Sequence, residues 1–162
     1  MKTVKRLSFL ILLITTLMSC VPARTAITSP EAATKNVDTQ SDKNSNFIKA
    51  NEWMVQTFNN AKSVIQFKDK EAGIVKGKYV MKEGTISTSP YVKSIPTFFS
   101  VITIRVKDNA SRIEIEAPSG MYSQKAMGVE YGFTEETFKT EANRLINEFE
   151  IYMKKASTND NW

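Results

Sequence analysis

The chain carries few of the side chains that usually do chemistry in enzymes. Its 162 residues include a single cysteine, Cys20, and no histidine. Histidine is the commonest general base near neutral pH and a frequent ligand of zinc and copper. Its absence disfavours such metal sites and triad-type nucleophiles, so we predict no metal site and no cofactor. Cys20 is then the one reactive group whose role the sequence has to explain.

The residues before Cys20 have the pattern of an export signal. Three basic residues at the start are followed by an apolar run over residues 7–18. The run is too short to span a bilayer, which takes about 20 residues, and this pattern is typical of a signal peptide, here over residues 1–19. Without these residues the chain keeps 19 basic and 17 acidic residues. Such a balance gives no reason to expect nucleic acid as a partner.

The four residues Leu17, Met18, Ser19 and Cys20 resemble the lipobox of bacterial lipoproteins. This resemblance implies cleavage between Ser19 and Cys20, a diacylglycerol in thioether linkage to the Cys20 sulfur, and acylation of the new amine. Two or more acyl chains anchor a protein stably, whereas one holds it only marginally. Because Val21 is not an aspartate, we expect the outer membrane of a Gram-negative bacterium, facing the periplasm. The alternative is an ordinary secretory signal followed by an incidental cysteine.

Residues 20–45 have the composition of a flexible tether behind the acylated cysteine. They are rich in Thr, Ser, Ala, Asn and Asp, contain two prolines and have almost no large apolar side chains. Such a segment buries too little apolar surface to offset the entropy lost on ordering. We therefore predict a spacer here and a folded domain over residues 46–156, with residues 157–162 as a disordered tail.

Two helices are predicted at the ends of this domain. The first begins with Ser45 or Asn46 as its N-cap, and the second begins with Thr134 as its N-cap. Each has an apolar stripe at three- and four-residue spacing, which is typical of a helix packed on a sheet. The stripes are Phe47, Ala50, Met54, Phe58 and Ala61 in the first helix, and Phe138, Ala142, Leu145, Phe149 and Tyr152 in the second.

Four strands are predicted between the helices, over residues 63–67, 74–81, 98–107 and 110–117. A turn that ends at Gly73 joins the first two strands, and a two-residue turn at Asp108 and Asn109 joins the last two. The last two strands have one apolar and one charged face, as in an antiparallel sheet with one side in solvent. We expect a two-layer α+β domain in which both helices cover one face of a four-stranded antiparallel sheet.

Part of the chain is similar to a known family. The segments NEWMVQTFNNAKSVIQFKDKEAGIVKGKYVM and ITIRVKDNASRIEIEA resemble a family of uncharacterised bacterial envelope domains with a TATA-binding-protein-like (TBP-like) fold. The resemblance implies the order α-β-β-β-β-α with both helices on one sheet face. It implies no activity, and the name of the fold does not carry DNA binding with it, because function belongs to sites and not to folds.

The remaining polar residues leave several kinds of site open. Serine and lysine are abundant, so a Ser–Lys or carboxylate-based hydrolase is an alternative, although no Ser-x-x-Lys motif supports it. Glu114 and Glu116 lie two apart on one strand and are expected on a solvated face. Lys76, Lys78 and Lys82 could form a basic strip for an anionic lipid or glycan, or could be ordinary exposed strand lysines.

Two long connections, residues 82–97 and 118–133, are the stronger candidates for a partner surface. Long loops inside a compact domain are uncommon and are often functional. Amphipathic and adaptable side chains suit a partner surface, and the residues expected to form it are Tyr91, Ile95, Met121, Tyr122 and Tyr131.

Together these patterns predict a membrane-anchored binding module of the envelope that acts without catalysis. Its expected contacts are the membrane, through acylated Cys20, and an envelope protein or glycan. The hydrolase above and a structural accessory of an envelope assembly are the alternatives.

Overall fold

The computed structural model describes residues 24–59, 63–86, 88, 94–126 and 129–155. The predicted signal peptide, Ser19, Cys20, Ala61, Tyr91 and the predicted tail lie outside these residues. Neither helix in the described part of the chain is long and apolar enough to cross a membrane.

The main sheet has five antiparallel strands. They are β2 (Ala33–Asp38), β3 (Val64–Asp69), β4 (Ile74–Lys82), β5 (Phe98–Lys107) and β6 (Ala110–Ile115), in the order β2-β6-β5-β4-β3. The β3–β4 hairpin turns through Gly73, which has a positive φ, and the β5–β6 hairpin turns through Asp108 and Asn109. Both predicted hairpins are therefore confirmed. The prediction of four strands is wrong, because β2 adds a fifth at the edge.

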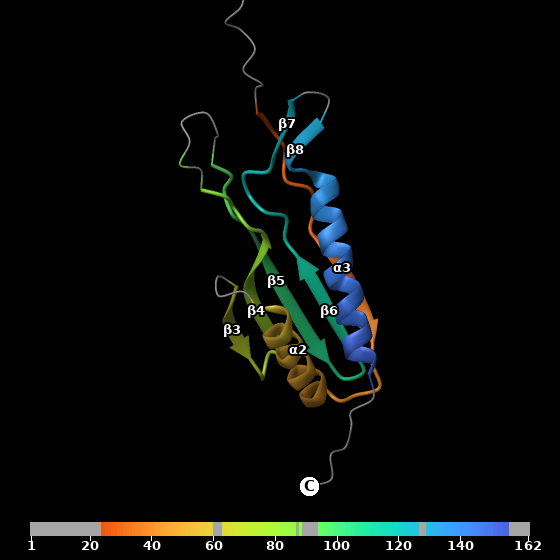
Figure 1. Cartoon of the computed structure of the whole chain (residues 1–162). Helices are drawn as coiled ribbons and strands as arrows, with labels where there is room; N and C mark the ends of the chain where they lie inside the picture. The colour runs from red at the N-terminus through yellow and green to blue at the C-terminus, as the bar shows by residue number, and fades with distance from the viewer. Residues whose placement is uncertain (1–23, 60–62, 87, 89–93, 127–128, 156–162) are drawn as a thin grey trace, which may run out of the picture.

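A second, three-stranded sheet lies at one end of the molecule (Figure 1). It contains β1 (Thr25–Ala26), β7 (Tyr122–Ala126) and β8 (Val129–Phe133), in the order β1-β7-β8. The β7–β8 hairpin occupies much of residues 118–133, which the sequence predicts as a loop. That prediction is wrong because the run is short and interrupted by glycines, so its alternation is hard to recognise.

Two helices cover one face of the five-stranded sheet (Figure 1). Helix α2 (Lys43–Thr57) packs on β4 and β5, and helix α3 (Glu135–Lys154) packs on β2, β6 and α2. The prediction of Thr134 as the N-cap of α3 is confirmed, since its side chain accepts a hydrogen bond from the Thr137 amide. The N-cap of α2 is Asp42 and not Ser45 or Asn46.

The core lies between this sheet face and the two helices. The sheet contributes alternate residues of β5 and β6, and the Trp53 ring of α2 meets the Phe149 ring of α3 edge to face at 5.2 Å. The inward faces predicted for β5 and β6 are confirmed. The most deeply buried side chains of the sheet and helices include Ile102, Ile104, Ile113, Ile115, Met54, Phe138, Leu145 and Phe149.

From Arg24 on, the segment predicted as a flexible tether forms part of the fold instead. Strand β2 pairs with β6 along its whole length, from Ala33 opposite Ile115 to Asp38 opposite Ala110. Its Val37 side chain is buried in the core, and the Lys35 amine donates to the Glu150 carboxylate of α3 at 2.5 Å. The tether prediction fails because β2 gains its stability from partners that are remote in the sequence.

Candidate functional site: the open face of the sheet

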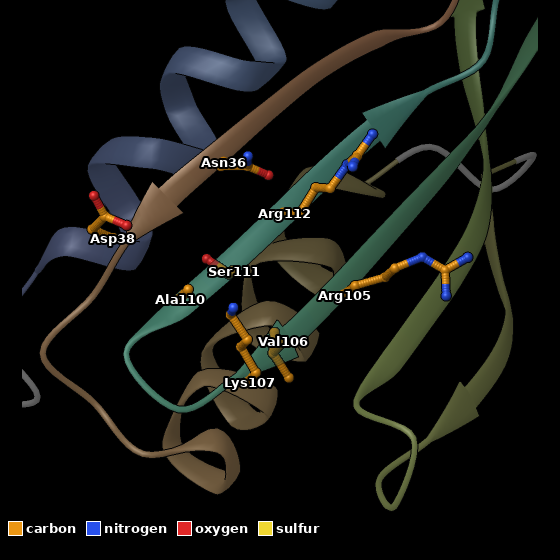
Figure 2. A pocket seen from close by; sticks show the side chains of 8 residues that line it. All are labelled: Asn36, Asp38, Arg105, Val106, Lys107, Ala110, Ser111 and Arg112. Atoms are coloured by element: carbon orange, nitrogen blue, oxygen red, sulfur yellow. The ribbon is translucent and has the colours of Figure 1, made fainter.

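The face of the five-stranded sheet opposite the helices carries most of the charge that the strands contribute. We call it the open face. Successive strand residues point to opposite sides, so the register that buries Ile102 and Ile104 of β5 places Thr103, Arg105 and Lys107 on the other side. Figure 2 views this side, with the helices behind the strands.

Two arginines face each other across the β5–β6 hairpin on the open face. Arg105 is directly opposite Arg112 in the register, and like charges in such positions repel each other. Among the described residues, Arg112 forms one ion pair, a distant one of 3.9 Å with Glu114 on its own strand. Arg105 is exposed and forms no ion pair with any residue in the described ranges. The pair therefore keeps an excess of positive charge that the protein does not neutralise.

The arginines border a shallow hollow of about 350 Å³. Its lining comes from three adjacent strands, and Lys107 and Asp38 are both next to Ala110 in the register. Figure 2 shows both side chains extending away from Asp38, Arg105 towards β4 and Arg112 along β6, so the one acidic group of the lining does not cover them. The lining residues are Asn36, Asp38, Arg105, Val106, Lys107, Ala110, Ser111 and Arg112.

The hairpin turn beneath the hollow is fixed by hydrogen bonds to the segment between β2 and α2. Asn109 has a left-handed backbone with φ of 59°, which asparagine tolerates better than most residues. Its amide donates to the Ser41 carbonyl, and its carbonyl accepts from the Thr39 amide, both at 2.9 Å. The buried Asn46 side chain of α2 donates to the Lys107 carbonyl at 2.9 Å. These contacts hold the ends of β5 and β6, and with them the arginine pair, in one position.

The other side chains of the open face are more nearly neutralised. Lys76 lies 3.9 Å from Glu116, and the Lys78 amine lies 3.8 Å above the centre of the Phe99 ring. Exposed pairs of this kind contribute little to stability. Lys82 does not form a basic strip with Lys76 and Lys78, because its amine donates to the Gly132 carbonyl in the second sheet.

Among the described residues, the Ser45 hydroxyl donates to the Asp42 carboxylate at 2.8 Å, but this contact belongs to the N-cap of α2 and lies apart from the arginine pair. Of the buried serines, Ser63 accepts a hydrogen bond from the Val80 amide, and the hydroxyls of Ser100 and Ser111 have no hydrogen-bond partner.

The buried Lys49 amine donates to the carbonyls of Met153 and Lys155 at the end of α3. No group of three or more potential metal-ligating side chains gathers in the described part of the chain. The arginine pair can bind an anion but has no adjacent group to activate a nucleophile.

The partner surface predicted from the two long connections is only partly a surface. Met121, just before β7, and Tyr122, the first residue of β7, are 1% and 8% exposed because both belong to the hydrophobic core. The centre of the Tyr122 ring lies 6.1 Å from that of the Phe98 ring. These two residues cannot contact a partner, and the prediction is wrong for them. Ile95 is partly buried and bridges to Thr85. Tyr131 is 54% exposed.

Sequence reasoning missed the arginine pair, although the signal was present. The two-residue turn at Asp108 and Asn109 fixes the register of the hairpin, and counting back from it places Arg105 opposite Arg112. Glu114 and Glu116, which the sequence places on the same solvated face, lie near Arg112 and Lys76 respectively.

Comparison with solved structures supports the fold. A DUF4468 family protein from Bacteroides ovatus superimposes with a TM-score of 0.52 and 15% identity, over 80% of this chain and 92% of the other. A TBP-like protein from Parabacteroides distasonis gives 0.50 and 12%, over 77% and 94%. At these identities the likeness concerns the fold alone.

A search of curated proteins gave no match. A family description matches residues 33–119, from the start of β2 to just beyond β6, which is more than half of the chain. The matched segment therefore includes β2, the arginine pair and the whole five-stranded sheet. The chain belongs to the family described as a domain of unknown function (DUF4468) with TBP-like fold.

Proposed function

We propose that this protein is a non-catalytic binding module of the bacterial envelope, held at a membrane through acylated Cys20, that binds an anionic partner on its open face. The observation that carries the proposal is the cross-strand pair of Arg105 and Arg112, which keeps positive charge on an exposed, rigid surface. The lipobox-like residues before Cys20 support the anchor and the periplasmic side of the outer membrane as its location.

The chemistry of the pair favours anionic groups such as carboxylate, phosphate or sulfate. A guanidinium group presents several N–H donors in a planar fork that matches these anions in two-point contacts. Two guanidinium groups from adjacent strands, with Lys107 two residues beyond Arg105, can hold a partner that carries repeated negative charges. An incoming anion also relieves the repulsion between the two arginines, so binding removes an unfavourable interaction of the free protein.

Binding without catalysis is the simplest activity for these residues. A hydrolase based on Ser, Lys and carboxylates needs a hydroxyl next to a base, and the buried serines have other neighbours or none. A structural accessory of an envelope assembly would use the same open face, so this alternative differs from the proposal only in the partner that is bound.

Dextran sulfate is a suitable polyanionic probe for the open face, with uncharged dextran as the negative control. The variant Arg105→Ala/Arg112→Ala should lose most of the affinity for dextran sulfate in a binding titration followed by fluorescence anisotropy. The matched variant Lys139→Ala/Lys154→Ala removes the same net charge from α3, on the other side of the sheet. Equal losses in the two double variants would show that net charge alone attracts the probe and would refute a site on the open face.

The anchor is tested by Cys20→Ser in the full chain. We expect the substituted protein to keep its signal uncleaved and to be lost from the outer-membrane fraction. Unchanged processing and unchanged membrane retention would contradict acylation at Cys20.

A further inference from the structure

Three segments of the chain meet at the end of the molecule that carries the second sheet. Strand β1 pairs with β7, and the Arg24 guanidinium donates to the Ser94 carbonyl of the β4–β5 connection at 3.3 Å. The Lys82 amine, at the end of β4, donates to the Gly132 carbonyl of β8 at 2.9 Å. We call this the β7–β8 end; it lies at the top of Figure 1, where the described part of the β4–β5 connection also rises from the sheet.

The β7–β8 end exposes apolar and aromatic side chains. Ile86, in the β4–β5 connection, is 89% exposed, which is the highest value among the large apolar side chains described, and Tyr131 of β8 is 54% exposed. Lys125 of β7 is also exposed. Aromatic rings with a polar tip favour the boundary between lipid and water, and lysine reaches lipid phosphates from there. Tyr131 is opposite Gln124 in the register and Lys125 is opposite Glu130, so Tyr131 and Lys125 lie on opposite faces of the hairpin. With Ile86, they have the chemistry of a hairpin end that meets a membrane with both of its faces.

The position of β1 limits the distance between the β7–β8 end and the proposed lipid anchor at Cys20. Arg24 is held beside β7, with its guanidinium 4.6 Å from the centre of the Tyr122 ring. Cys20 precedes Arg24 by four residues, and four residues of fully extended chain span at most about 14 Å. The headgroup region on each side of a bilayer is itself about 5–7 Å deep. An acyl group on Cys20 therefore keeps the β7–β8 end within reach of the headgroups.

We propose that the β7–β8 end rests on the lipid surface, with Ile86 and Tyr131 in the headgroup region and Lys125 near the lipid phosphates. This inference depends on the proposed acylation of Cys20 and adds to it an orientation and a second contact. The partner of this end is the bilayer surface, because the short segment between acylated Cys20 and Arg24 brings lipid close to it. The β5–β6 turn and the arginine pair lie at the opposite end of the sheet (Figure 1) and therefore point away from the membrane.

A single-cysteine probe in the full-length acylated protein tests this orientation. The Cys20 sulfur is blocked by its thioether, so Ile86→Cys and Tyr131→Cys each introduce one thiol that a maleimide fluorophore can label. The labelled proteins are reconstituted into vesicles of phosphatidylethanolamine and phosphatidylglycerol that contain a headgroup-region nitroxide lipid. Ile151→Cys and Val55→Cys are matched controls, since these exposed apolar residues of α3 and α2 are 62% and 65% exposed.

We expect the nitroxide lipid to quench most of the fluorescence at positions 86 and 131 and to leave positions 151 and 55 almost unchanged. Equal quenching at all four positions, in proteins that co-float with the vesicles, would overturn the orientation and leave the anchor intact. Proteins that do not co-float would overturn the acylation of Cys20, and the orientation would fail with it. Vesicle flotation thus separates the failure of the proposed function from the failure of this inference.

Discussion

Asn46 shows how one buried polar side chain organises the neighbourhood of the arginine pair. Its amide nitrogen donates to the Thr39 hydroxyl and the Lys107 carbonyl at 2.9 Å, and to the Ser41 carbonyl at 3.1 Å. The residue is completely buried. The sequence suggests Asn46 as an N-cap because asparagine favours that position, but here its polarity serves contacts between α2, the end of β5 and the segment after β2.

Replacement of Asn46 by alanine should destabilise the protein by about 1–3 kcal/mol, because it leaves the part-buried Lys107 carbonyl without this donor. Urea unfolding followed by circular dichroism measures the change. Asn44→Ala is the control, since Asn44 is exposed on the same helix. A change of similar size in both variants would mean that helix propensity, and not the buried hydrogen bonds, accounts for the loss.

Glu150 links the edge strand to α3 in a pH-dependent way. Hydrogen bonds from Lys154 and from Lys35 hold its pKa at about 2, below the ordinary value of 4.5. A carboxylate whose pKa falls on folding stabilises the protein above its unfolded pKa, and this stabilisation is lost as the pH falls from about 4.5 towards 2. The Lys35 contact thus makes the attachment of β2 sensitive to acid.

Glu150→Gln should therefore lower the free energy of unfolding near neutral pH and weaken the dependence of that free energy on pH below 4.5. Unfolding titrations of the two proteins across this range should converge towards pH 2. Glu31→Gln serves as the control, because Glu31 is exposed and forms no ion pair with a described residue. Parallel curves for native protein and Glu150→Gln would rule out this role for Glu150.

At the scale of elements, the sequence predicts the helices and strands whose hydrophobic pattern repeats within the element itself. The stripes of α2 and α3 and the alternation of β5 and β6 repeat over one element, so they are visible without knowledge of the partners. Strand β2 has one strongly apolar position, Val37, and its pairing with β6 is remote in sequence. Strands β1, β7 and β8 are five residues or fewer and pair mainly with one another. Propensity over so few residues cannot separate a strand from a loop.

The candidate site, likewise, could be predicted where it depends on local patterns and not where it depends on β2. The alternation of β5 and β6 places Arg105 and Arg112 in solvent, and the short turn gives their register. The hollow beside them also needs Asn36 and Asp38 of β2, so its shape depends on the strand that the sequence does not reveal.

The close contact between the end of α2 and β4 predicts the effect of a substitution at Gly77 of β4. A Cβ at Gly77 would overlap the Phe58 ring and approach the Met54 methyl group to 2.9 Å. Gly77→Ala should destabilise the protein by about 1–3 kcal/mol through overpacking. Phe58→Leu in the same chain should restore part of that loss, because it removes the obstructing ring. Thermal unfolding of the single and double variants measures both effects, and full additivity would argue against the steric explanation.

For the whole molecule, the two proposed contacts lie at opposite ends. Strand β5 begins at Phe98, whose ring stacks on Phe133 of the second sheet at 4.8 Å, and ends next to the arginine pair. From Phe98 to Arg105 the strand advances about 23 Å at its usual rise per residue. A protein resting on its β7–β8 end would hold the arginine pair well away from the lipid.

Energy transfer to acceptor-labelled lipids can measure this separation. A donor on Lys107→Cys should transfer less energy to the lipids than the same donor on Ile86→Cys, because the two positions lie near opposite ends of the sheet. Equal transfer from both positions would mean that the protein lies on its side on the membrane.

The position of β2 also dictates the order in which the protein can fold. This strand is synthesised before the rest of the main sheet, yet it pairs with β6 and is covered by α3. Its Lys35 meets Glu150, 115 residues further along the chain. Contacts so distant in sequence form slowly, because a long loop must close first. The attachment of β2 therefore forms only after β6 and α3 have been synthesised, so the N-terminal edge of the main sheet is the part that is completed last.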